Sequence, residues 1–106
     1  MILTNINGTS QLTCSCGSWL RHWEIFSGQT TEFCQALGCN RKDVLGAHVQ
    51  LAGGNDKWYI YPLCNLHNQH DGLLWVSDAY RLVSANTRET CERAATGYSY
   101  RSPWQR

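Results

Sequence analysis

The stretch WYIYPLCNLHNQHDG, residues 58–72, joins an aromatic segment to a short segment rich in Cys, His and Asn. Aromatic and β-branched residues such as those of the first part favour a β-strand, whereas the second part is short enough for a single helical turn. Cys64 and His67 lie three positions apart and therefore share one face of that turn. A thiolate and an imidazole placed in this way can supply half of a tetrahedral zinc site.

A second pair of donors precedes this stretch. Cys34 and Cys39 flank a short loop that contains Gly38. Residues 44–61, with the turn AGGND inside them, have the pattern of a β-hairpin, and we expect Pro62 to end its second strand. The order of loop, hairpin and helix is that of a treble-clef zinc finger. The alternative is a set of buried free thiols with a surface His. The zinc interpretation predicts one structural site, made by Cys34, Cys39, Cys64 and His67.

The other cysteines suggest a second site. Ser18 can cap a short helix that Gly28 ends, and His22 lies within it beside two tryptophans. We expect a second zinc ion to tie the N-terminal turn to a C-terminal helix; the alternative for His22 is a packing or capping role. The proposed ligands are Cys14, Cys16, His22 and Cys91.

Length and composition predict a single α+β domain over residues 1–106. A chain of 106 residues that is 42% hydrophobic can bury one modest core. We expect a lead-in or edge strand at 1–13, a folded core at 14–95 and a flexible tail at 96–106. Further strands are expected at LLWVS and YRLVS, and a helix at 86–95, capped by Asn86 or Thr87. The bulky aromatic side chains expected mostly in the core are Trp19, Trp23, Trp58, Tyr59 and Trp75.

Charge and cysteine usage bear on partners and compartment. A net charge of +1 disfavours broad electrostatic capture of a polyanion, although the tail interleaves aromatic and basic residues as single-strand binders do. No stretch resembles a signal peptide or a membrane span, so we expect a cytoplasmic protein with no membrane partner. Six Cys in that reducing compartment favour metal ligands, while a disulfide-framed secreted domain is the alternative. No small-molecule substrate is indicated.

Residues 39–72 resemble the HNH, or His-Me finger, family of nucleases. The segment GAHV supplies His48, and PLCNLHN supplies Cys64, His67 and Asn68. The resemblance implies a ββα core in which His48 is a general base and Asn68, or Asp71, holds a Mg²⁺ or Mn²⁺ ion. More loosely, CGSWLRHW, GAHVQ, WYIYPLC and SANTRETC look like segments of small bacterial and phage proteins of uncharacterised function.

The chain departs from the nuclease pattern in two places. The family's central Asn falls at residues 59–61, which are Tyr, Ile and Tyr, and Ala47 and Val49 flank His48 where a second His or Asp is expected. Other roles for His48 are a bond to a backbone carbonyl or zinc ligation in place of His67, and His70 is expected to be incidental. We therefore predict a zinc-binding, HNH-like domain that binds nucleic acid or a protein partner without intact catalytic machinery. The alternative is a metal-dependent HNH endonuclease that uses His48 and Asn68.

Overall fold

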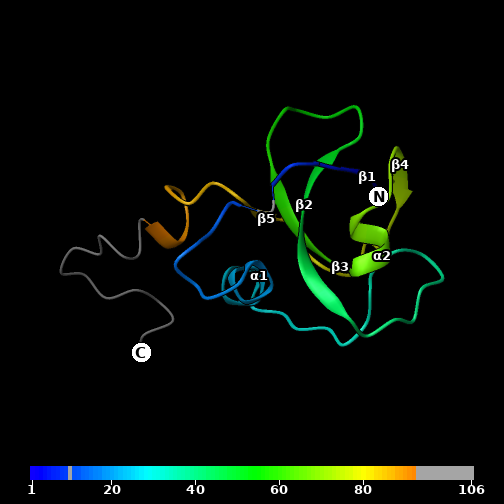
Figure 1. The fold of residues 1–106 in the computed structure, drawn as a ribbon, viewed down its shortest axis with the longest axis horizontal. Helices are drawn as coiled ribbons and strands as arrows, with labels where there is room; N and C mark the ends of the chain where they lie inside the picture. Colours follow the sequence, from blue (N-terminus) through cyan, green and yellow to red (C-terminus); the bar gives the residue numbers. More distant parts are fainter. Residues whose placement is uncertain (10, 93–106) are drawn as a thin grey trace.

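The computed structural model describes residues 1–9 and 11–92, and these form an antiparallel sheet with two helices. The sheet has five strands in the order β4-β1-β2-β3-β5 (Figure 1). The strands are β1 (Ile2–Asn5), β2 (Val44–Leu51), β3 (Tyr59–Cys64), β4 (Leu73–Trp75) and β5 (Val83–Ser84), and the helices are α1 (Trp19–Ser27) and α2 (Asn65–Asn68). This arrangement confirms the α+β class. No helix in the described ranges is long and apolar enough to cross a membrane.

The strands β2 and β3 form the expected hairpin, but Pro62 does not end β3. The pairing continues through Gly46 with Pro62 as far as Val44 with Cys64. The carbonyl of Pro62 accepts a hydrogen bond from the backbone N–H of Gln35 at 3.2 Å. Because the N and O atoms of one strand residue point to the same side, the proline nitrogen also faces away from β2. No bond between β2 and β3 is lost, so the strand runs on to Cys64.

The first residues of the chain belong to the sheet rather than to a lead-in. Strand β1 lies between β4 and β2, pairing Leu3 with Leu51 on one side and with Leu74 on the other. The side chain of Leu3 is fully buried. The expectation of an edge strand or loose segment at residues 1–13 is therefore wrong for β1, because its apolar side chain fills the core that β2 and β4 share.

Helix α1 has the predicted ends. The Ser18 hydroxyl accepts a hydrogen bond from the Arg21 backbone N–H, and Gly28 ends the helix in the left-handed region at φ 71°. Its buried side chains His22 and Trp23 face β2 and β3. The absence of a side chain at Gly46 allows the close approach, since a Cβ there would lie 2.4 Å from the carbonyl carbon of Trp19.

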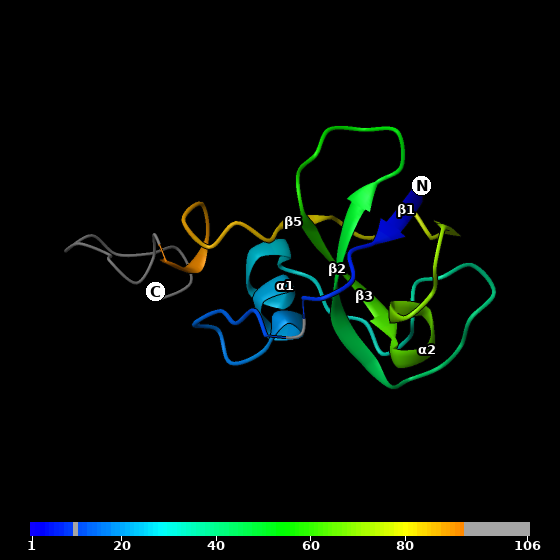
Figure 2. The same ribbon diagram turned by 45° about the horizontal axis from the view of Figure 1, so that its top comes forward.

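The hairpin separates two hydrophobic clusters. Ala47, Val49, Tyr61 and Leu63 on one face pack with Cys34 and Cys64, while Ile60 on the other face packs with Trp23. Helices α1 and α2 lie on opposite sides of the hairpin (Figures 1 and 2). Two of the tryptophans expected in the core are exposed instead, with 41% of Trp58 and 57% of Trp75 accessible. Both stand near ends or edges of strands, where the sheet has no layer to cover them.

The C-terminal part is described only to residue 92. Residues 87–90 form a turn, and helical backbone follows at 91 and 92. Asn86 starts this turn, since its side-chain oxygen accepts from the Arg88 backbone N–H at 2.9 Å. The remainder of the expected helix at 86–95 and the tail at 96–106, including its proposed single-strand-binding role, lie outside the described residues.

Candidate metal centres

The first predicted donor group is brought together at the open end of the hairpin. The Nδ1 atom of His67 lies 3.2 Å from the sulfur of Cys64 and 3.5 Å from the sulfur of Cys34. The sulfur of Cys39 lies 4.0 Å from that of Cys64. One donor atom from each of these four residues lies within 4.8 Å of all the others. The group therefore has the composition and the compactness of a single metal site.

These separations fit zinc. With Zn–S near 2.3 Å and Zn–N near 2.0 Å, the edges of a tetrahedron are about 3.8 Å between sulfurs and about 3.5 Å between sulfur and nitrogen. The distances of 3.2, 3.5 and 4.0 Å scatter around those values. A disulfide would need sulfurs about 2.0 Å apart, and all six cysteines are free thiols in this structure. The donors of the first group are thus placed to surround one ion rather than to pair covalently.

The loop that carries Cys34 and Cys39 is a tight turn. The backbone N–H of Cys39 donates to the carbonyl of Ala36 at 3.0 Å, and Gly38 takes φ 79°, which other residues rarely adopt. The backbone N–H of Cys34 donates to Arg41 at 2.9 Å and closes the loop from the other side. Two cysteines are therefore presented on a rigid turn before the hairpin begins.

The end of β3 supplies the other two donors. Cys64 is the residue that caps α2, and its sulfur accepts a hydrogen bond from the His67 backbone N–H at 3.4 Å. The side-chain amide of Asn5 in β1 donates to the carbonyls of His67 and His70 at 2.8 and 3.0 Å. It holds the single turn of α2 against the sheet. This support was not predicted, because nothing near Asn5 in the sequence indicates that β1 passes beside α2.

Burial disfavours the thiolate form of the cysteines in the first group when no cation is bound. The side chains of Cys34 and Cys64 are 2% and 0% exposed. Burial raises the pKa of the Cys34 thiol to about 12, although hydrogen bonds from the backbone of Ala36 and Cys64 act in the opposite direction. A divalent cation reverses this preference, because it binds thiolates and displaces their protons.

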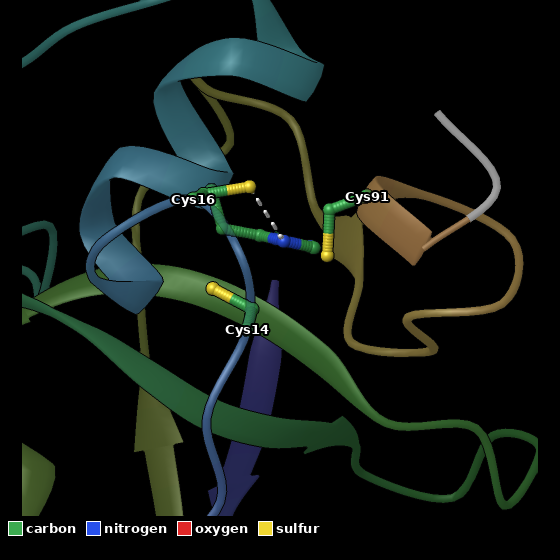
Figure 3. A group of neighbouring side chains, drawn as sticks. Cys14, Cys16 and Cys91 are labelled. Atoms are coloured by element: carbon green, nitrogen blue, oxygen red, sulfur yellow. Dashed lines mark hydrogen bonds between the residues drawn. The ribbon is translucent and has the colours of Figure 1, made fainter. Parts of the chain in front are cut away.

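The second group lies on the α1 side of the sheet. Its donors are Cys14, Cys16, His22 and Cys91, and their donor atoms also lie within 4.8 Å of one another. Figure 3 shows Cys14, Cys16 and Cys91 close to one another beside α1, and the Cys16 sulfur lies 3.7 Å from Nδ1 of His22. The donors come from the turn before α1, from α1 itself and from the C-terminal turn. The structure thus brings together the four residues proposed from sequence.

The imidazole of His22 is held in the form that a metal requires. Its Nε2 atom lies 2.9 Å from the carbonyl oxygen of Ser84. Because a carbonyl can only accept, Nε2 carries the proton, and the lone pair on Nδ1 faces the sulfur atoms. Burial lowers the pKa of His22, with the Ser84 bond opposing that shift, and this direction favours the neutral ring. The alternative of a packing or capping role does not account for this orientation of Nδ1.

The thiols of the second group are also unfavourable as isolated anions. Burial, together with the neighbouring Cys91 and Cys14, raises the pKa of Cys16 to about 12. The pKa of Cys91 moves down, because hydrogen bonds involving Ser15 and Cys16 outweigh the opposite effect of burial. A bound divalent cation would stabilise these sulfurs as thiolates and displace their protons.

His48 and Asn68 do not meet. His48 is opposite Ile60 on the face that α1 covers, and its ring contacts Trp19 edge to face at 4.5 Å between centroids. Asn68 lies on α2, across the sheet, beside a hollow formed with residues 6–9. His48 is only 5% exposed, its Nε2 has no hydrogen-bond partner, and burial and His22 lower its pKa. His48 belongs to neither donor group, so it does not replace His67.

His70 is exposed, as expected, yet it has a structural contact. Its Nε2 lies 2.9 Å from the carbonyl oxygen of Leu73 and thereby occupies an outward-facing acceptor of the edge strand β4. The backbone N–H of Leu37 likewise donates to the carbonyl oxygen of Trp75 at 3.0 Å. These two bonds cover an edge that could otherwise pair with another chain.

Comparisons with protein-family models, with curated proteins and with solved structures found no match to this chain.

Proposed function

We propose that this chain is a small treble-clef zinc domain that acts as a binding module rather than as an enzyme. The observation that carries the proposal is the closed donor set of the first group. Cys34, Cys39, Cys64 and His67 supply all four positions of a tetrahedral ion. Catalytic zinc sites in proteins keep one position for water or substrate, whereas structural sites fill all four from the chain. A filled set of three thiolates and one imidazole favours a structural role.

The exposed surface favours a protein partner over nucleic acid. Leu73 and Trp75 alternate with the buried Leu74 on β4, so both project outward from the same strand, with 55% and 57% of each accessible. Leu37, in the turn between Cys34 and Cys39, is also exposed, and its backbone N–H donates to the carbonyl of Trp75 on this strand. Large exposed apolar side chains gathered in one region are typical of protein interfaces.

The cations of the described residues support the same preference. Arg41 pairs with Asp43 at 3.0 Å, and Arg21 pairs with Glu24 at 3.5 Å. Lys42 lies over the ring of Phe33, 5.5 Å from its centroid. These are three of the six Lys and Arg residues that the structure describes, and the net charge over the whole chain is only +1, so the positive potential available for a phosphate backbone is small.

The zinc part of the proposal is tested by counting metal. Protein purified without added zinc should contain zinc, and removal of the metal with a chelator should unfold the hairpin reversibly, as circular dichroism would show. Metal-free protein that keeps the same fold and thermal stability would exclude a structural ion.

The binding part is tested with a matched pair of surface variants. A double variant, Leu73→Ser with Trp75→Ser, should lose a protein that co-purifies with the parent chain and is identified by mass spectrometry. Leu12→Ser, at a residue that is also 45% exposed but outside β4, should retain it. The opposite outcome is that all variants retain bound material that absorbs as nucleic acid does, is digested by nuclease and is released by salt. That outcome would support nucleic acid as the partner.

A further inference from the structure

The C-terminal turn, residues 86–92, makes few hydrogen bonds to the rest of the domain. Within residues 86–92, the hydrogen bonds of Asn86, Thr87 and Glu89 all go to residues 84–92. Among the described residues, the bonds that leave this segment are those of the Cys91 thiol, which contacts Ser15 and Cys16. Cys91 is nonetheless only 5% exposed. In the described part of the chain, the hydrogen bonds by which residues 86–92 reach the turn before α1 are therefore those of Cys91, a member of the second donor group.

The second group is also open to the solvent on one side. A hollow of about 370 Å³ is lined by Thr13, Cys14, Ser15, Thr87, Cys91 and Glu92, so two of the four donors form part of its wall. In the first group Cys34 and Cys64 lie inside the larger hydrophobic cluster, while Cys39 and His67 are partly exposed. A competing ligand in solution can reach the second group without opening the core.

We propose that Cys14, Cys16, His22 and Cys91 form a second zinc site that works as a releasable clamp, fastening the C-terminal segment to the start of α1. The site is independent of the proposed binding partner. Its ion joins residues 14 and 91, which lie far apart in sequence, and so does what a disulfide does in an oxidising compartment. Loss of this ion frees residues 86–92, while the first group and the hairpin stay folded.

The orientation of His22 extends the effect of the clamp to β5. The ring that offers Nδ1 to the ion donates Nε2–H to the carbonyl of Ser84. Ser84 pairs with Tyr59 at the end of the sheet, and its hydroxyl donates to Glu89 at 3.0 Å. Metal binding thus fixes His22, and His22 fixes the strand from which the C-terminal turn departs. The clamp acts at both ends of the segment 84–91.

The test is a stepwise removal of zinc from the intact chain with EDTA, followed by zinc counting and hydrogen exchange. We expect a plateau at one zinc per chain, at which amides of residues 86–92 lose protection while those of β2 and β3 keep it. The amides of Thr90 and Glu92, which bond to the carbonyl of Thr87, are the most direct reporters. Loss of both ions together, with β2 and β3 exchanging at the same time, would overturn the clamp.

A variant gives an independent measurement. Cys91→Ser should bind one zinc instead of two, and replacement of zinc by Co²⁺ should give half of the parent's thiolate-to-cobalt absorption per chain. Arg88→Ser, an exposed position in the same turn, is the matched control and should bind two. Two zinc ions bound by Cys91→Ser, or protection of residues 86–92 unchanged in it, would contradict the proposal.

Discussion

The two donor groups have the same chemistry, three cysteines and one histidine, but differ in how the chain assembles them. The first is built from a turn and a helix start on either side of one hairpin, and its sulfurs lie in the main hydrophobic cluster. The second gathers donors from both ends of the described chain onto α1, beside an open hollow. One group is part of the core, whereas the other joins pieces that the core does not hold. The same ligands can therefore organise a fold or merely fasten it.

The largest expected effect comes from breaking the first group. Cys64→Ser removes a fully buried ligand that also caps α2. Structural zinc contributes about 10–16 kcal/mol in small zinc domains, which matches or exceeds the roughly 5–15 kcal/mol of total stability that domains possess. We expect Cys64→Ser to be unfolded, with neither group binding metal, as judged by circular dichroism and zinc content.

The matched control for that variant is Leu66→Ser. Leu66 lies in the same helical turn, is 59% exposed and contributes no donor, so its replacement by Ser should leave both ions and the fold in place. A folded Cys64→Ser chain that retains the second ion would show that the hairpin does not depend on the first group. The first group would then not be the one on which the fold depends.

The metal donors can be predicted from the sequence more reliably than the strands can. Spacing sufficed for Cys34 with Cys39 and for Cys64 with His67, because each pair is joined by a short turn whose geometry is local. The link to Cys91 was weaker as a prediction, since only the fold brings residues 14 and 91 together. Pro62 and Leu3 were misjudged for the same reason: whether a residue tolerates a place in a sheet depends on which neighbour faces it, and sequence alone does not identify that neighbour.

A second prediction separates the groups by moving α1. Gly46→Ala places a Cβ 2.4 Å from the Trp19 carbonyl carbon and 2.5 Å from the Leu20 nitrogen, so the helix backbone must shift. We expect a loss of about 3 kcal/mol, at the upper end of the usual cost of overpacking. Because His22 lies on α1, the affinity for the second zinc should fall more than the affinity for the first. Urea unfolding and competitive chelator titration measure the two effects.

The control for Gly46→Ala is Gly53→Ala in the hairpin turn. A Cβ at Gly53 meets no atom within 4 Å, but its φ of 69° is unfavourable for Ala. This variant should lose about 1–2 kcal/mol from backbone strain alone and leave the two zinc affinities in their original ratio. Equal weakening of both sites by Gly46→Ala would mean that α1 does not position the second group independently.

A smaller effect is expected where β1 supports the first group. Asn5→Ala removes the two hydrogen bonds to the carbonyls of His67 and His70. Each such bond contributes about 1 kcal/mol, and loss of the buried Oδ1 of Asn5, which has no partner, offsets part of this. We expect a net loss of about 1 kcal/mol in urea unfolding, with faster release of the first ion. Asn7→Ala, at an exposed position after β1, should change neither quantity.

The smallest effect on stability is expected at His48, between the two groups. Its Nε2 is buried without a partner, and its ring packs edge to face against Trp19. His48→Phe removes the unsatisfied atom and keeps an aromatic ring, so the free energy of unfolding should stay within about 1 kcal/mol of the parent value.

The endonuclease alternative predicts that the same variant loses activity, because Phe cannot act as a general base. Incubation of plasmid with each protein and Mg²⁺ or Mn²⁺ distinguishes a catalytic role of His48 from a packing role. Cleavage by the parent that His48→Phe abolishes, without a change in stability, would assign His48 to catalysis. No cleavage by either chain would agree with a packing role, in which the ring of His48 is buried against α1 and takes no part in catalysis.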